Sequence, residues 1–244
     1  MRGLILCGGT GSRLSPLTKC INKHLLPIGE KPMAQWNIEK LVDAGIKEIM
    51  IVSGKEHCGS IFQQFGDGSE FGCNLTYKVQ EKAGGIAEAI YLAKDWARND
   101  NITVVLGDNI SNISLNPYIL WNDFEGAIVF LKSVEDPQRY GVAEFYKKLS
   151  MKNNQVKITS IVEKPKEPKT NYAVTGYYIF DKTVFDRIEK LKYSDRGELE
   201  VTDLNMSYLN DNLLTGYVMW EWEWWTDAGT HESLATANEL IRIK

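Results

Sequence analysis

The chain has no excess of positive charge. Its 244 residues include 28 lysines and arginines and 32 aspartates and glutamates, which gives a formal net charge of −4. Proteins that bind nucleic acids usually carry a basic stripe, so this balance argues against a nucleic-acid partner. An anionic ligand would have to be held by a few local cations rather than by the general field of the molecule.

Paired cysteines and metal-type spacings are also absent. The four cysteines, Cys7, Cys20, Cys58 and Cys73, form no CxxC pair and have no histidine at a zinc-ligand spacing. We interpret them as free or buried thiols in a reducing compartment. The three histidines lie apart from any serine or cysteine motif, so a catalytic triad has little support.

Long hydrophobic runs are missing as well. The apolar run at residues 4–7 is too short for a signal peptide and far too short to span a membrane. The sequence therefore predicts a cytoplasmic protein with no membrane partner. A chain of this length can bury a sizeable core without disulfide or metal cross-links.

Strand-like and helix-like segments alternate through the first half of the chain. Strands are predicted at residues 3–7, 46–53, 75–79 and 101–109, and helices at 32–45 and 85–97. This alternation predicts an α/β, Rossmann-like fold, in which helices flank both faces of a mostly parallel sheet.

After residue 125 the pattern changes to strands with little helix between them. Strands are predicted at 127–134, 140–146, 156–164, 172–180 and 213–225, and helices at 185–191, 199–211 and 231–243. We expect a mixed or antiparallel portion along one edge of the sheet. Within the last strand, the Trp-Glu-Trp-Glu-Trp alternation at 220–224 is interpreted as tryptophans that face a core or a subunit interface, with a sugar-stacking platform as the alternative.

The first predicted strand ends in a loop with almost no side chains, Gly-Gly-Thr-Gly-Ser-Arg at residues 8–13. The loop has neither the Gly-Lys-Ser/Thr of a Walker A motif nor the spacing of G-x-G-x-x-G. It is compatible with a tight strand-to-helix turn. However, glycines let backbone N–H groups approach a ligand closely, and Arg13 and Lys23 add two cations near the end of the strand. Together these features predict a phosphate site where parallel sheets bind ligands.

Two strand-like segments end in an aspartate, Asp108 in VVLGDN and Asp227 in WWTDAGTH. Each alone could cap a turn, which is the usual role of such a residue. Mg²⁺ is bound through one or two carboxylates together with substrate phosphates. With Arg13 and Lys23, the two carboxylates therefore predict a metal–phosphate site.

A third cluster is basic. Glu163 and Lys164 end a strand before Pro165, which restricts the direction of Lys164. Arg196 stands beside a glycine at a helix start. Lys166, by contrast, is interpreted as a solvated loop charge.

These segments, in this order, resemble the sugar-nucleotide pyrophosphorylases, and specifically the glucose-1-phosphate thymidylyltransferases. The resemblance covers essentially the whole chain through GGTGSRL, NKHLLPI, KPM, LGDN, RYGVAEF, VEKPKEPKTNYAVTGYY, RGELEVTDLN and WTDAGTH. It implies a nucleotide-diphospho-sugar transferase fold as a single domain, 1–244. The nucleotide-binding part would be roughly 1–110 and the sugar-binding part roughly 111–225, followed by a C-terminal helix at 231–244.

The resemblance also implies residue roles. The implied nucleotide-binding residues are Leu6, Gly8, Gly9, Thr10, Gly11, Ser12, Arg13, Lys23, Gln80, Gly85 and Asp108, with Gln80 and Gly85 at the base edge. The implied residues around the sugar and its phosphate are Asn109, Tyr140, Gly141, Glu163, Lys164, Val174 and Arg196. Arg13, Lys23 and Lys164 would be catalytic, and Asp108 and Asp227 would ligate Mg²⁺.

The implied reaction joins dTTP and glucose-1-phosphate by in-line attack of the sugar-phosphate oxygen on the α-phosphorus, giving dTDP-glucose and pyrophosphate. The family is commonly dimeric or tetrameric, so a homo-oligomer is expected. Other nucleotides (UTP, CTP), another sugar-1-phosphate and a glycosyltransferase that uses a finished nucleotide sugar are the alternatives. A silent paralogue that acts as a binding subunit is a further one.

Three departures from the family pattern bear on specificity and regulation. His24 stands where long members have Gln, and residues 83–85 read Ala-Gly-Gly where they have a Pro or Asp. The first change affects one base or phosphate contact, and the second bears on the selectivity for thymine. The chain also stops soon after its last predicted helix, where long members continue into an extension linked to packing and to an allosteric site. We expect all or part of that regulatory site to be absent.

Overall fold

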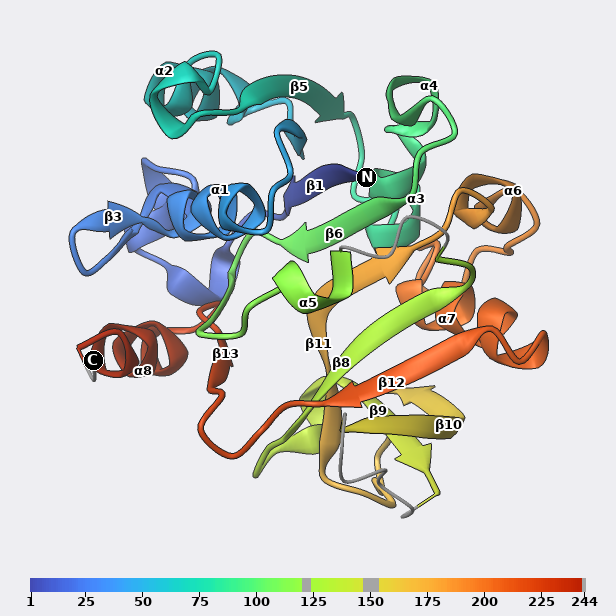
Figure 1. The fold of residues 1–244 in the computed structure, drawn as a ribbon. Coiled ribbons are helices and arrows are strands. Elements are labelled where there is room, and N and C mark those ends of the chain that lie inside the picture. The colour runs from blue at the N-terminus through green and yellow to red at the C-terminus, as the bar shows by residue number, and fades with distance from the viewer. Residues whose placement is uncertain (120–123, 147–153, 243–244) are drawn as a thin grey trace.

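The computed structural model describes residues 1–119, 124–146 and 154–242. The main strands are β1 (Arg2–Cys7), β4 (Glu48–Gly54), β5 (Asn74–Gln80), β6 (Ile102–Leu106), β8 (Ala127–Ser133), β9 (Gly141–Phe145), β10 (Gln155–Glu163), β11 (Tyr172–Phe180) and β12 (Leu214–Val218). Within the described residues they form one 9-stranded sheet in the order β5-β4-β1-β6-β11-β8-β12-β10-β9 (Figure 1). Two short sheets pair β2 (Pro27–Ile28) with β3 (Lys31–Pro32) and β7 (Asn109–Ser111) with β13 (Trp225–Asp227).

The helices cover both faces of the sheet (Figure 1). They are α1 (Met33–Asp43), α2 (Cys58–Phe65), α3 (Ile86–Tyr91), α4 (Lys94–Ala97), α5 (Asn116–Ile119), α6 (Val184–Ile188), α7 (Val201–Asn210) and α8 (His231–Leu240). Short 3₁₀ turns are η1 (Ser12–Leu14), η2 (Leu17–Lys19), η3 (Lys23–Leu25), η4 (Ser69–Phe71) and η5 (Pro137–Arg139). None of the helices that the structure describes is long and apolar enough to cross a bilayer.

The strand directions confirm the predicted α/β fold. β5, β4, β1 and β6 are mutually parallel, whereas β11 runs antiparallel to both β6 and β8. β12 returns to a parallel pairing with β8, and β10 and β9 complete an antiparallel edge. The sheet is therefore parallel over the first half of the chain and mixed beyond it. The predicted division into nucleotide-binding and sugar-binding parts stays a prediction.

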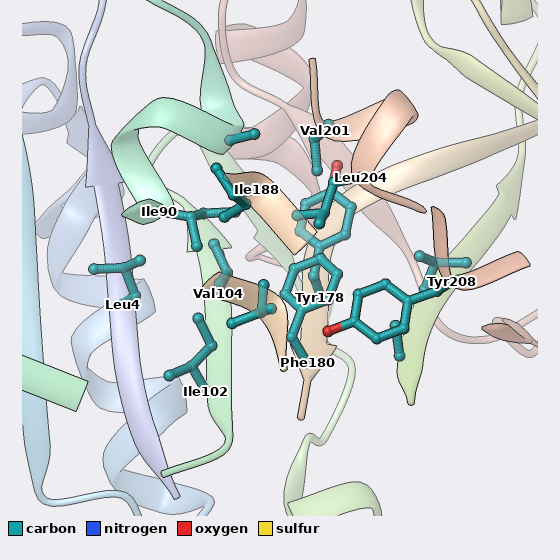
Figure 2. Packing of buried hydrophobic residues seen from close by; sticks show 14 of the residues in the cluster. Leu4, Ile90, Ile102, Val104, Tyr178, Phe180, Ile188, Val201, Leu204 and Tyr208 are labelled. Atoms are coloured by element: carbon teal, nitrogen blue, oxygen red, sulfur yellow. The ribbon is translucent and has the colours of Figure 1, made fainter. Parts of the chain in front are cut away.

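The central strands are buried on both faces, as continuous apolar runs in a covered parallel sheet require. In β1, Leu4 and Leu6 belong to the core beneath α3, α6 and α7, part of which Figure 2 shows. Ile5 and Cys7 point the other way, into the core beneath α1 and α2. All four cysteines of the chain are free thiols, as predicted.

One predicted helix divides in two. The predicted helix at 85–97 forms α3 and α4, because the chain tightens into a turn between them. There, the Ala93 N–H donates to the Ile90 carbonyl at 3.0 Å, a bond to the third preceding residue rather than the fourth. The apolar period alone does not reveal such a change of turn.

The predicted strand 213–225 is wrong over its middle, which is a turn between β12 and β13. The Glu223 N–H donates to the Trp220 carbonyl (3.0 Å), and the Trp220 N–H donates to the Glu223 carboxylate (2.8 Å). The rings of Trp220 and Trp222 stack at 4.8 Å, and Trp222 is exposed. Trp224 packs against a small apolar cluster that includes residues of α1 and α8, so the core interpretation holds for that residue.

Gly107 is closely packed between β6 and β7. A β-carbon added there would lie 2.6 Å from Cδ2 of His24, 2.8 Å from Sγ of Cys7 and 2.9 Å from the Leu6 carbonyl. Because Gly107 has no side chain, the C-terminal end of β6 can lie close to the C-terminal end of β1. This approach sets the position of Asp108, the next residue.

We expect Gly107→Ala to lower the free energy of unfolding by about 1–3 kcal/mol, because the added methyl group overpacks this contact. Gly59→Ala in α2, where a β-carbon would meet nothing within 4 Å, is the matched control. Urea unfolding of both variants is the measurement. Equal stability of the two variants would contradict the packing role of Gly107.

Candidate active site

A cavity of about 450 Å³ opens where β1 and β6 end. It brings together most of the predicted site residues: Leu6, Gly8, Gly9, Arg13, Lys23, Gln80, Gly85, Asp108, Asn109, Tyr140, Gly141, Glu163, Lys164, Val174, Arg196 and Asp227. Thr10, Gly11 and Ser12 belong to the same loop but do not line the cavity. The predicted residues thus come together from segments far apart along the chain, and their roles stay predictions.

The glycine loop after β1 needs glycine at two positions. Gly9 and Gly11 have φ values of 90° and 63°, in the left-handed region that other residues rarely adopt. A β-carbon on Gly11 would also lie 2.8 Å from Cγ2 of Thr18 and 3.1 Å from Cβ of Lys23. The Thr18 hydroxyl donates to the Gly11 carbonyl at 2.8 Å, which fixes the loop against the following segment.

Lys23 reaches Asp108 across this loop. Its ammonium donates to Oδ2 of Asp108 at 2.5 Å, and the side chains are only 12% and 15% exposed. Burial raises the pKa of Asp108, but the Lys23 charge and the Asn109 amide, which donates to Oδ1 at 2.9 Å, outweigh it. The net effect holds the pKa of Asp108 below its usual range, so this carboxylate is ionised.

Asn22 holds Lys23 in place. Its side-chain oxygen accepts from the His24 backbone N–H at 2.7 Å and caps η3. The same oxygen accepts from Nδ1 of the His24 ring at 2.7 Å. His24 lines the cavity with its ring already bonded to Asn22.

Asp227 carries the second carboxylate of the site. Burial raises the pKa of Asp227, and the nearby Asp108 charge adds to this, while the charges of Arg139 and Arg13 oppose it. Arg139 donates to Oδ2 of Asp227 at 2.8 Å. A β-carbon at Gly229 would lie 3.2 Å from the Arg13 guanidinium and 3.5 Å from the Asp108 carboxylate, so this turn brings the charged groups together.

Asn109, in β7, is hydrogen-bonded to β11 and β13 next to the two aspartates. Its Oδ1 accepts from the Gly176 N–H (2.9 Å) in β11 and from the Trp225 indole (2.6 Å) in β13. Its Nδ2 donates to Asp108. Its backbone carbonyl accepts from the Tyr177 hydroxyl at 3.0 Å. These bonds indicate that the Asn109 side chain positions Asp108 and Trp225.

The far end of the cavity is built around Glu163. Its carboxylate accepts from the Thr202 hydroxyl (2.7 Å) and lies 3.4 Å from the Lys164 ammonium and 3.7 Å from Arg196. Arg196 also donates to Glu200 at 2.8 Å. Lys164 has a φ of 43°, which turns the chain sharply where β10 ends. Glu163 thus contacts two half-exposed cations, of which Arg196 is also paired with Glu200.

The opposite end is mostly apolar. Its wall is contributed by β1, β4, β6 and α3 through Leu6, Val52, Ile86, Ala89 and Leu106. Gln80, at the end of β5, is the amide on this wall. A flat, largely apolar ligand group suits such a slot.

Among the cavity residues that were not predicted from the sequence, Arg139 and Trp225 contact the predicted ones directly. Arg139 belongs to the RYG segment but was passed over for its neighbours Tyr140 and Gly141. It bonds Asp136 (2.7 Å) as well as Asp227, and its guanidinium lies 5.1 Å from the centre of the Tyr140 ring. Trp225 was interpreted within a strand but lines the cavity. The sequence did contain a signal for Arg139, because this cation directly precedes the predicted strand at 140–146.

The family model for nucleotidyl transferases matches residues 2–243. This chain belongs to the nucleotidyl transferase family. Two curated members are similar along nearly all of it. A glucose-1-phosphate thymidylyltransferase of Neisseria meningitidis is 39% identical over 245 residues, which cover 99% of this chain and 83% of that protein. One from Mycolicibacterium smegmatis is 38% identical, with 99% and 82% covered.

Solved structures of nucleotidyl transferases show the same fold. A candidate glucose-1-phosphate thymidylyltransferase from Bacillus anthracis, in complex with a sucrose, has a TM-score of 0.91 and 51% identity over 100% of this chain and 96% of its own. A UDP-glucose pyrophosphorylase in complex with UDP-glucose has a TM-score of 0.87 at 24% identity, with 99% and 98% covered, which supports the fold alone. The resemblance stated from the sequence is confirmed.

The buried ring of His24 has a lowered pKa, which links the stability of this nucleotidyl transferase to pH. Burial, with a smaller contribution from the Lys23 charge, lowers the pKa of His24 from 6.5 to about 3. Between these values the unfolded chain binds one proton more than the folded chain. The contribution of His24 to the free energy of unfolding therefore falls as the pH drops below 6.5, by up to about 1.4 kcal/mol per pH unit.

We expect His24→Gln to lose about 2 kcal/mol less stability than the native chain between pH 7 and pH 5. Urea unfolding at both pH values measures this, and His231→Gln, at an exposed position, is the control. An unchanged pH dependence in His24→Gln would show that the ring is not held neutral.

Proposed function

We propose that the protein transfers the thymidylyl group of dTTP to glucose-1-phosphate and releases pyrophosphate. The observation that carries this proposal is that one cavity is lined by two pairs of cations, Arg13 with Lys23 and Lys164 with Arg196, and by Asp108 and Asp227. Lys23 pairs with Asp108, whereas Lys164 and Arg196 both lie beside Glu163. Two phosphate-bearing substrates need such an arrangement, because their anionic groups must be brought together. The names of the curated relatives support the same reaction.

The reaction needs no nucleophile from the protein. A phosphate oxygen of glucose-1-phosphate attacks the α-phosphorus of dTTP, and the bond from that phosphorus to the bridging oxygen of pyrophosphate breaks. Lys164 and Arg196 hold the sugar phosphate, while the glycine loop and Arg13 bind the departing pyrophosphate. Lys23 stabilises charge on the α-phosphate. Catalysis is then positioning and charge stabilisation.

The two aspartates fit a Mg²⁺ ion whose remaining ligands come from the substrate. Asp108 is ionised, and its charge is close enough to raise the pKa of Asp227. Within the residues that the structure describes, no cluster of three or more His, Cys, Asp or Glu side chains could hold a metal ion. Two carboxylates plus phosphate oxygens suit Mg²⁺, which would supply charge neutralisation at the phosphates.

A cytoplasmic location and a homo-oligomeric state, dimer or tetramer, stay predictions.

Pyrophosphate release from the purified protein tests the proposal. We expect release only when Mg²⁺, dTTP and glucose-1-phosphate are all present, with dTTP favoured over UTP, CTP, ATP and GTP. A glycosyltransferase would release no pyrophosphate, and a silent paralogue would bind nucleotide without turnover. Release that needs another sugar phosphate would change the substrate and leave the reaction type in place.

We expect Lys23→Ala and Asp108→Asn each to lower turnover by about two to four orders of magnitude, because each removes charge stabilisation from the transition state. Lys166→Ala, at an exposed loop position outside the cavity wall, is the control. Steady-state pyrophosphate release measures the effect. A loss of less than about fivefold in both variants would rule out these roles.

A further inference from the structure

The Gln80 amide at the apolar end of the cavity is held in one orientation. Its Nε2 donates to Oε2 of Glu88 at 2.9 Å and to the Gly85 carbonyl at 3.3 Å. A carboxylate and a carbonyl can only accept hydrogen bonds. The nitrogen of the amide must therefore face these two groups, and Oε1 must point elsewhere.

Oε1 of Gln80 points toward the glycine loop. A β-carbon added at Gly8 would lie 3.4 Å from this oxygen, and both residues line the cavity. The apolar end of the cavity thus presents a hydrogen-bond acceptor of fixed orientation. An amide without Glu88 could rotate about its last torsion and present either its oxygen or its NH₂ group.

Gly84 makes room for the carboxylate that orients Gln80. A β-carbon at Gly84 would lie 1.8 Å from Oε2 of Glu88 and 2.3 Å from its Cδ. The φ of Gly84 lies outside the left-handed region, so glycine is needed here for space rather than for backbone conformation. Gly84 and Glu88 therefore act together on Gln80. This Gly84 belongs to the Ala-Gly-Gly turn at which the sequence departs from long family members.

We propose that Glu88 is a positioning residue that fixes Gln80 as a hydrogen-bond acceptor and so makes the site select bases with an imide N–H over cytosine. Thymine and uracil carry a proton on N3, which an acceptor can bind. Cytosine has a lone pair on N3 instead. Oε1 of Gln80 and N3 of cytosine would then be two acceptors facing each other, and the hydrogen bond would be lost. The inference rests on the proposed function, because it places the base of the nucleotide at this wall.

The role of Glu88 has a specific signature. A fixed acceptor does not read the 5-methyl group, so it separates dTTP and dUTP from dCTP but leaves dTTP and dUTP alike. A purely structural defect would lower activity with all three nucleotides together. The ratios of kcat/KM between nucleotides therefore distinguish the two roles.

The test is Glu88→Gln, which keeps the shape of the side chain but can accept or donate toward Gln80. We expect the dTTP to dCTP ratio of kcat/KM to fall by about tenfold or more, and the dTTP to dUTP ratio to stay within about twofold. Glu81→Gln, the same change at an exposed neighbour of Gln80, should keep the native ratios. Thermal melts check that each variant is folded.

Gly84→Ala provides a second route to the same result, because its methyl group displaces the Glu88 carboxylate without changing Glu88. It decides the question if Glu88→Gln does not fold. A native protein that uses dCTP as well as dTTP, or a folded Glu88→Gln with an unchanged dTTP to dCTP ratio, would overturn the inference.

Calorimetric binding of dTTP, dUTP and dCTP separates this inference from the proposed reaction. A native protein that releases no pyrophosphate yet binds dTTP over dCTP, with the preference lost in Glu88→Gln, contradicts the reaction and supports the role of Glu88. Binding of none of the three nucleotides would overturn both.

Discussion

Lys23 and Asp108 meet where two buried parallel strands end, and the rest of the site depends on their ion pair. Charges withdrawn from water to this extent are costly unless they are paired and hydrogen-bonded. Asp108 meets this need through Lys23 and the Asn109 amide, and Lys23 is placed by a turn that Asn22 caps. The pair therefore keeps an anion and a cation side by side at the point where phosphates would enter.

The second carboxylate has its own cationic partner. Arg139 bonds Asp227 and is itself held by Asp136, so the two aspartates stay close although their charges repel. Asn109 ties both to the sheet by bonding Gly176 of β11 and Trp225 of β13. Bonds between β7, β11 and β13 thus hold the charged groups in place. Such preorganisation is what a reaction between two anionic substrates requires.

The parallel half of the fold follows from local pattern, because apolar strands and amphipathic helices alternate with clear turn signals. The errors have local causes too. The tryptophan alternation matched a strand period, but the bonds between Trp220 and Glu223 form a turn there. Arg139 was passed over because its partner Asp227 lies far along the chain, and no spacing rule connects them. Glu88 likewise acts on a side chain of another element, across a gap that only Gly84 leaves open.

The sequence by itself determined most of the strand and helix order, the glycine loop after the first strand and most of the cations and carboxylates that line the cavity. These features are local, since each depends on periodicity or on the conformational freedom of one residue. Only the tertiary structure decided which charges are paired, which amide faces the cavity with its oxygen, and which side chains serve to position others. Those outcomes depend on distances between residues that are distant in sequence, and such distances are set by the packing of the sheet and its helices rather than by any local pattern.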